Sequence, residues 1–122
     1  FKDFDWSKAE EYMGLMTQNP DNFGNLKNHS ELAAKLAENK IVFTLCIDLL
    51  SSVLCKSAGD MGADITVGSA QRMGVPMAFG GPHPGFFATT DKLKRKMPGR
   101  VIGISKDVHG NQAFRMAMQT RE

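Results

Sequence analysis

The sequence predicts an α/β fold built on a mixed sheet, and three observations support this prediction. Apolar residues at helical spacing over residues 32–37 are followed at once by an apolar run at 41–47. This order is typical of a helix that crosses over to a neighbouring strand. A second strand-like run follows at 64–70, and the last third of the chain contains short extended segments between turn residues. Crossover and hairpin-like connections in one chain indicate a sheet with both strand directions.

The length and composition favour a globular domain and argue against several other classes of protein. The chain has 122 residues, of which 42% are hydrophobic, so it can bury a core and does not resemble a disordered chain. Its formal net charge of +2 is too small to indicate binding to nucleic acid. No apolar run is long enough to span a membrane, and no signal peptide is recognisable.

The first half of the chain alternates extended and helical patterns. Residues 11–18 are predicted to form a strand, which the turn residues Asn19 and Pro20 end. Asn28 or Ser30 is expected to cap a helix that runs to about Asn39. The remaining expectations for this half are a buried strand at 41–47, covered on both faces, a helical turn at 49–54, a loop at 59–62 and a strand at 64–70.

The second half is predicted to be mainly extended. We expect a strand at 86–89, a short polar helix at 91–97, a strand at 100–105, a turn at 106–111 and a strand at 113–120. The basic residues of the polar helix and the next strand form either a solvated surface or a docking patch, and the solvated surface is the simpler interpretation. They are Lys92, Lys94, Arg95, Lys96 and Arg100.

The loop at 71–85 is unusually rich in glycine and proline. Glycine permits positive φ and close backbone approach, whereas proline fixes φ, so such a loop is built for one shape. It either presents binding residues at a strand end or is a tight connection that needs unusual turns. Gln71 and His83, which Pro82 and Pro84 flank, are its candidate cleft-lining residues.

Asp48 is the third candidate for a cleft, because it ends the predicted strand at 41–47 and ligands of α/β sheets bind beyond the carboxyl ends of strands. It either caps the following helical turn or contacts a ligand, and the capping role is favoured. Cys46 and Cys55 are interpreted as buried free thiols. The residue spacing predicts no metal site, and no residue is assigned a catalytic role.

Long segments of the chain resemble one enzyme family. The segments are GADITVGSAQRMGVPMAFGGPHPGFFAT, MPGRVIGISKD and RMAMQTRE, with MTQNPDNFG, CIDLLSSVL and GDMGAD upstream. Together they resemble the N-terminal half of the glycine cleavage system P-protein, which is the pyridoxal-phosphate-dependent glycine dehydrogenase (decarboxylating). The resemblance covers nearly the whole chain. It implies that residues 1–122 are a single fragment of the large domain of a fold type I, aspartate-aminotransferase-like transferase, with a mixed sheet.

The resemblance also implies where the cofactor is bound. In this fold an aspartate at the position of Asp48 pairs with the pyridinium nitrogen of pyridoxal phosphate, and a lysine forms the Schiff base. Aligning the two halves of the family on the Val75-Pro76 step places Gln71 at the position of that lysine and Ala70 at the position of the histidine that precedes it. An amide cannot form an imine. The cofactor is therefore expected on the other half, and this segment alone is expected to be inactive.

The implied reaction is the decarboxylation of glycine with transfer of the aminomethyl group to the lipoyl arm of the H-protein. The implied partners are glycine, the H-protein and the C-terminal half or a second P-protein subunit, without nucleic acid or membrane. The implied compartment is the bacterial cytoplasm or the mitochondrial matrix. The alternative is a non-catalytic interaction module that supports a partner pyridoxal phosphate subunit.

Overall fold

The computed structural model describes residues 4–119 of the chain. The chain divides into two compact units, Phe1–Ala88 and Thr89–Glu122. None of the helices in the described residues is both long enough and apolar enough to cross a membrane.

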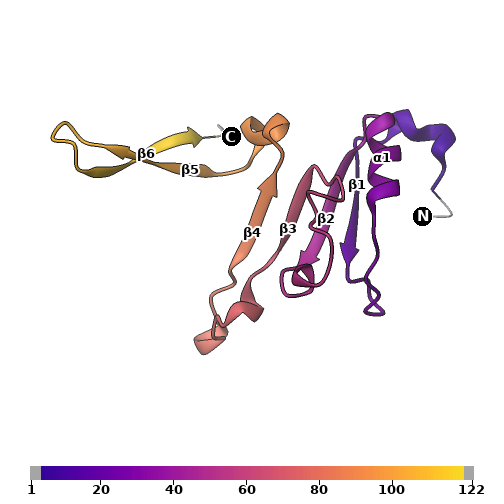
Figure 1. Cartoon of the computed structure of the whole chain (residues 1–122), viewed down its shortest axis with the longest axis horizontal. Coiled ribbons are helices and arrows are strands. Elements are labelled where there is room, and N and C mark those ends of the chain that lie inside the picture. The colour runs from indigo at the N-terminus through magenta and orange to yellow at the C-terminus, as the bar shows by residue number, and fades with distance from the viewer. Residues whose placement is uncertain (1–3, 120–122) are drawn as a thin grey trace. The chain divides into compact units, whose positions relative to one another are not determined.

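The first unit is organised by a four-stranded sheet whose strands follow one another in chain order. Strands β1, β2 and β3 are parallel, with Leu15 opposite Phe43 and Asp48 opposite Ser69. Strand β4 runs in the opposite direction (Figure 1). The α/β class with a mixed sheet is therefore confirmed. The bounds of the strands are Gly14–Asn19 for β1, Val42–Asp48 for β2, Ile65–Ser69 for β3 and Gly85–Thr89 for β4.

Helix α1, Ser30–Glu38, makes the crossover between β1 and β2, as the apolar spacing predicts. Its N-cap position is His29, whose side chain makes no capping hydrogen bond. Asn28 lies one position earlier, and its Oδ1 accepts hydrogen bonds from both the N–H and the Oγ–H of Ser30, at 3.0 and 2.7 Å. The predicted cap residues thus hold the helix start, although neither of them occupies the N-cap position.

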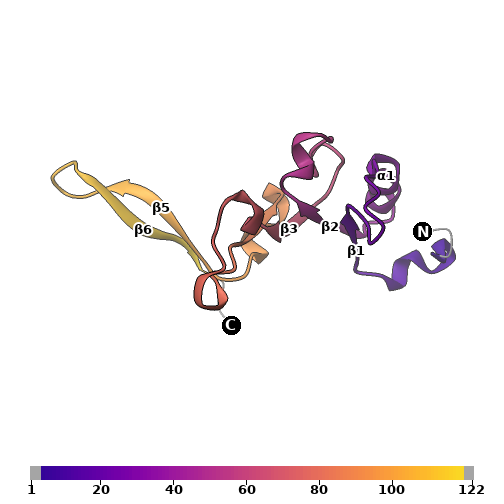
Figure 2. The same cartoon turned by 90° about the horizontal axis from the view of Figure 1, so that it is seen from below.

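The core of the first unit lies on one face of the sheet. Helix α1 and the segment that follows β2 cover this face together (Figure 2). Val42, Thr44 and Cys46 point to the other face and are only half-buried, so β2 is buried on one face rather than on both as the sequence suggested. The buried apolar residues are Ala9, Ala33, Leu36, Ile41, Phe43, Leu45, Ala58, Met61 and Ala63.

The start of the first predicted strand is wrong, because residues up to Glu11 belong to a 3-10 helix, η1, Trp6–Glu11. The Asp5 side chain accepts a hydrogen bond from the N–H of Ser7 at 3.1 Å, and this N-terminal cap favours a helical turn. Strand β1 begins only at Gly14.

The loops after β2 and β3 contain short 3-10 helices. These are η2, Ser51–Val53, after β2, and η3, Gln71–Met73, and η4, Ala78–Gly80, after β3. The predicted helical turn after β2 is η2. Gly74 and Gly81 have φ values of +95° and +78°. Side chains other than glycine are strained at such angles, so the glycines of this loop fix its shape.

The second unit contains the 3-10 helix η5, Asp91–Lys96, and an antiparallel hairpin of β5, Arg100–Lys106, and β6, Gln112–Gln119. The turn between the strands is held by Asp107, whose carboxylate accepts hydrogen bonds from the N–H groups of His109 and Asn111. The hydrogen bonds that its carboxylate accepts lower the pKa of Asp107, and the bond from the N–H of Asn111 has the largest effect. Thr120, predicted in the last strand, lies outside the described residues.

One face of the hairpin carries large apolar side chains. Ile102 lies opposite Met116 and Ile104 opposite Phe114, so all four side chains project to the same face. Each of the four is at least 50% exposed. A two-stranded hairpin is marginally stable alone, so this face is suited to being covered.

Candidate functional site

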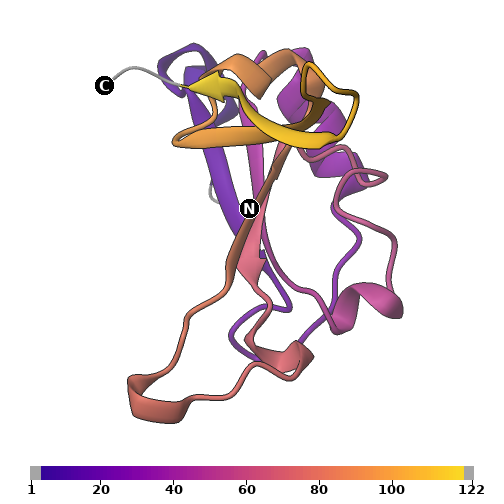
Figure 3. The same cartoon turned by 90° about the vertical axis from the view of Figure 1, so that its left-hand side faces the viewer.

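A cleft of about 290 Å³ lies at the carboxyl ends of the parallel strands. The arrowheads of β1, β2 and β3 point to one edge of the sheet, and the loop after β3 leaves from that edge (Figures 1 and 3). Each strand contributes its last residues to the cleft, and the loop contributes one. The residues used below are Gln18, Asn19, Cys46, Asp48, Ser69 and Arg72. This edge is where α/β sheets bind ligands.

An ion pair joins the sheet to the loop inside this cleft. Nη1 of Arg72, in η3, lies 2.6 Å from Oδ2 of Asp48, the last residue of β2. The Asp48 side chain is 21% exposed and that of Arg72 is 62% exposed. The carboxylate is thus largely shielded from water while the guanidinium remains open to it, so their attraction is screened less than that of a fully exposed pair.

Asp48 also holds the turn that follows it. Its Oδ2 accepts a hydrogen bond from the N–H of Ser51 at 3.3 Å, and its carbonyl oxygen accepts from the hydroxyls of Ser51 and Ser52 at 2.8 and 3.1 Å. The N-cap position of η2 is Leu50, so Asp48 does not occupy the cap position that the capping interpretation gives it, although its carboxylate accepts from the first N–H of the turn. Asp48 therefore has a structural role in both η2 and the loop.

Gln71 is folded back onto its own loop. Its N–H donates to Oγ of Ser69 at 3.1 Å, and its Nε2 donates to the carbonyl oxygen of Val75 at 3.0 Å. Its Oε1 is buried and accepts no hydrogen bond from the described residues. Gln71 therefore stabilises the loop through its hydrogen bonds. It lies in sequence between Ser69 and Arg72, which line the cleft, but does not line the cleft itself.

His83, the third candidate, lies far along the loop, and its side chain is exposed. Its carbonyl oxygen accepts a hydrogen bond from the N–H of Gly85 at 2.9 Å. It is not among the residues that line the cleft. Of the three candidates, only Asp48 lines the cleft, and its partner there is Arg72.

Sequence reasoning assigned no role in a cleft to two residues of its wall, Arg72 and Asn19. Arg72 belongs to the loop motif, but its pairing depends on Asp48 lying opposite Ser69 across the sheet. Asn19 is 4% exposed; its Nδ2 donates to the carbonyl oxygen of Lys27, and its Oδ1 accepts from the N–H of Lys27, at 2.9 and 3.0 Å. It thereby fixes the chain that leaves β1.

Both cysteines are free, as predicted, but each is half-buried rather than buried. Cys46 lines the cleft, and burial raises the pKa of its thiol, which favours the neutral form. Within residues 4–119, no cluster of three or more potential metal-binding side chains was found.

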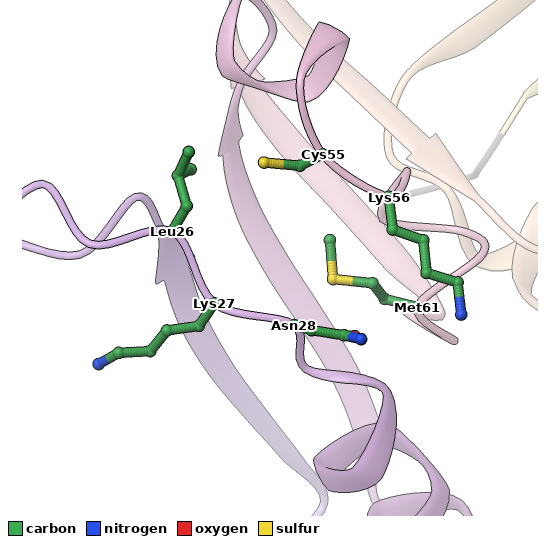
Figure 4. Close-up of a pocket in the computed structure, with 6 residues that line it drawn as sticks. All are labelled: Leu26, Lys27, Asn28, Cys55, Lys56 and Met61. Atoms are coloured by element: carbon green, nitrogen blue, oxygen red, sulfur yellow. The ribbon is translucent and has the colours of Figure 1, made fainter.

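A second cavity of about 240 Å³ lies between the segment before α1 and the segment after η2. The side chains of Cys55 and Met61 point into the space between the two segments, whereas those of Lys27 and Lys56 point away from it (Figure 4). The amine of Lys27 lies 2.8 Å from the Asp21 carboxylate. Apart from the two lysines, the lining consists of one thiol, the amide of Asn28 and the apolar side chains of Leu26 and Met61.

The basic residues of the second unit are exposed, as a solvated surface predicts. Among them, Lys94 lies 2.8 Å from Asp91 three residues earlier in η5.

Known proteins match the chain over nearly its whole length. The family model described as "Glycine cleavage system P-protein" matches residues 1–122. The "Glycine dehydrogenase (decarboxylating)" of Vibrio campbellii is 56% identical over 113 residues, which are 93% of this chain and 12% of that protein. The protein of the same name from Shewanella halifaxensis is 54% identical over 112 residues, 92% of this chain and 12% of that protein. The chain thus spans about 12% of the length of these relatives.

A solved structure matches the fold. It is described as the crystal structure of glycine decarboxylase (P-protein) of the glycine cleavage system in inhibitor-bound form. The match has a TM-score of 0.80 at 38% identity and covers 88% of this chain and 25% of that one. The predicted fold class, part of a fold type I, aspartate-aminotransferase-like large domain with a mixed sheet, is therefore confirmed.

Proposed function

The chain belongs to the glycine cleavage system P-protein family, and on this basis we propose that it acts as part of a glycine dehydrogenase (decarboxylating). Residues 1–122 form a part of the large domain of the N-terminal half, the half without the Schiff-base lysine. The observation that carries the proposal is the identity of 56% over 113 residues to an enzyme of that name.

The residues of the cleft do not fit pyridoxal phosphate as a covalently held cofactor. No lysine is among the described residues that line the cleft, and the amide of Gln71 is bonded to the backbone of Val75. A cofactor of the complete enzyme is therefore expected on the other half, and no chemical step is assigned to this cleft.

The role proposed for this segment is to shape the catalytic cleft of the other half. The loop at 71–85 is fixed by its glycines and by the Gln71–Val75 hydrogen bond, so it can present a side chain in a defined position. His83 is the exposed side chain that we propose for polar contact with the reacting site. A rigid loop costs less entropy to place than a mobile one.

The partners proposed for the complete enzyme are glycine, the lipoyl-bearing H-protein and the C-terminal half or a second P-protein subunit. The proposed compartment is the bacterial cytoplasm or the mitochondrial matrix. The two free thiols agree with a reducing compartment.

The test compares the full-length protein with the chain of residues 1–122. Release of carbon dioxide from carboxyl-labelled glycine, with lipoyl H-protein present, is expected from the full-length protein and not from the chain alone. Borohydride reduction followed by peptide mapping is expected to place the pyridoxyl group outside residues 1–122.

Two results would contradict the proposal. A pyridoxyl adduct at one saturable lysine within residues 1–122 would show that this segment holds the cofactor. A full-length protein that releases no carbon dioxide, yet is needed for the activity of a separate pyridoxal phosphate subunit, would favour the interaction module instead.

A further inference from the structure

The carboxyl-end cleft contains one negative and one positive group. Among the described residues that line it, only Asp48 and Arg72 carry a charge at neutral pH. Cys46, the other titratable residue there, has a thiol whose pKa is raised by burial, so it remains neutral. The remaining lining residues contribute amides, a hydroxyl and apolar groups. The cleft is therefore close to neutral overall but strongly dipolar.

Both charged groups retain unused hydrogen-bonding capacity. The carboxylate of Asp48 uses Oδ2 for Arg72 and for the N–H of Ser51, and its Oδ1 accepts nothing from the described residues. A guanidinium has five N–H donors. Arg72 directs Nη1 at Asp48, and within residues 4–119 its other nitrogens make no hydrogen bond. Each group can thus bind a second partner without losing the first.

The charge arrangement selects the class of ligand. A simple anion that approaches Arg72 is repelled by Asp48, and a simple cation that approaches Asp48 is repelled by Arg72. A zwitterion meets an attractive charge at each end, and the partial burial of Asp48 limits the screening of that attraction. The volume of about 290 Å³ suits a molecule of a few heavy atoms.

We propose that this cleft binds a small α-amino acid as its zwitterion, with the carboxylate on Arg72 and the ammonium on Asp48. The site is distinct from the decarboxylation site proposed for the other half. Because Arg72 belongs to η3 at the start of the loop, a bound zwitterion ties the end of β2 to the loop at 71–85.

The experiment measures the binding of labelled glycine to the full-length protein by equilibrium dialysis. Borohydride reduction comes first, so that glycine cannot bind through an imine. The expected result is that Arg72→Gln and the isosteric Asp48→Asn each weaken one class of glycine sites by at least about tenfold, the size of one lost charge-assisted hydrogen bond. Lys94→Gln, which removes an exposed cation of the second unit, is expected to leave binding unchanged.

Competition identifies the ligand chemistry. Alanine is expected to displace glycine, whereas acetate, methylammonium and inorganic phosphate are not, because each lacks one of the two charges or carries only one sign. Circular dichroism of the variants, with Arg72→Lys as a charge-preserving variant, separates loss of binding from loss of folding. Arg72→Lys is expected to retain weakened binding.

The proposal is overturned if folded Arg72→Gln binds glycine as the parent does, or if phosphate displaces glycine at this site. It is also overturned if no glycine site beyond a catalytic one is found, in which case the ion pair only anchors the loop. These results are independent of the proposed function, because that function is judged by carbon dioxide release before reduction.

Discussion

His83 is the residue whose contribution to catalysis is most directly testable. It is exposed, and Pro82 and Pro84 restrict its backbone. In the full-length protein, His83→Ala is expected to lower the rate of glycine decarboxylation about tenfold, as the loss of one hydrogen bond to a charged group does. Folding and cofactor content should stay normal, which circular dichroism and cofactor absorbance measure.

Lys94→Ala provides the control for His83. Its charge is paired with Asp91 on an exposed surface, so its loss should change the rate little. If η5 instead docks the H-protein, the defect of Lys94→Ala should fade as salt screens the attraction. Full activity of His83→Ala at both low and saturating glycine would show that the loop is only a scaffold.

His29 makes the stability of the first unit depend on pH. It is 5% exposed, and burial, followed by the charge of Lys27, lowers its pKa in the folded state. Below the ordinary histidine pKa, the unfolded chain therefore binds a proton at His29 more readily than the folded chain does. The contribution of His29 to the free energy of unfolding is fully present above that pKa and is lost as the pH falls below it. The urea midpoint of the chain is expected to be lower at about pH 5.5 than at about pH 7.5.

Two variants separate His29 from the other histidines. His29→Gln should reduce this pH dependence, whereas His109→Gln, in the exposed turn of the hairpin, should preserve it. An equal urea midpoint at the two pH values in the parent chain would contradict the assignment.

Among the elements, β2 contributes fully buried side chains to the core, and Phe43 is the residue that best tests this contribution. Phe43 is 1% exposed between α1 and the sheet, so Phe43→Ala should lower the free energy of unfolding by about 3–5 kcal/mol. Phe23 is 91% exposed, and Phe23→Ala should change it by less than about 0.5 kcal/mol. Urea titration at low protein concentration, followed by Trp6 fluorescence, measures both. Similar changes in the free energy of unfolding for Phe43→Ala and Phe23→Ala would show that the core does not lie around Phe43.

The elements with strong apolar periodicity were predictable from sequence. The predicted helix ending at about Asn39 corresponds to α1, Ser30–Glu38, and the predicted strand at 41–47 differs from β2, Val42–Asp48, by one residue at each end. Residues 11–13 were wrongly placed in a strand, because Glu11 ends η1 and the next two residues connect it to β1, which their apolar content does not reveal.

The site was predictable only in part. Asp48 was found because it follows an apolar run, and the ends of such runs meet at one edge of a parallel sheet. The pairing of Asp48 with Arg72 was not predictable from the sequence. It depends on the strand register that sets Asp48 opposite Ser69 and on the 3-10 turn that follows β3. Neither this register nor the geometry of this turn can be read from the spacing of residues within one segment of the sequence.

For the whole molecule, the apolar face of the hairpin is expected to govern association of the 122-residue chain in solution. Ile104 and Phe114 face each other across the strands and are 75% and 70% exposed. The chain should therefore self-associate and bind a hydrophobic dye. The double variant Ile104→Thr, Phe114→Thr should lower dye binding and shift sedimentation towards the monomer.

Val108→Thr tests whether the position of the apolar side chain matters. Val108 is 95% exposed but lies in the turn rather than on that face, so its replacement should leave association unchanged. A parent chain that sediments as a sharp monomer and unfolds cooperatively would contradict the expectation.

The order of the strands in the sheet has a consequence for how the chain is made. Strands β1, β2, β3 and β4 lie side by side in the order in which a ribosome synthesises them. Each strand that emerges can therefore join the outer edge of the sheet already formed, and none has to be inserted between two earlier ones. Because domains generally fold as units during synthesis, the first unit is able to complete its sheet without rearrangement once β4 has been made, while the second unit is still being added.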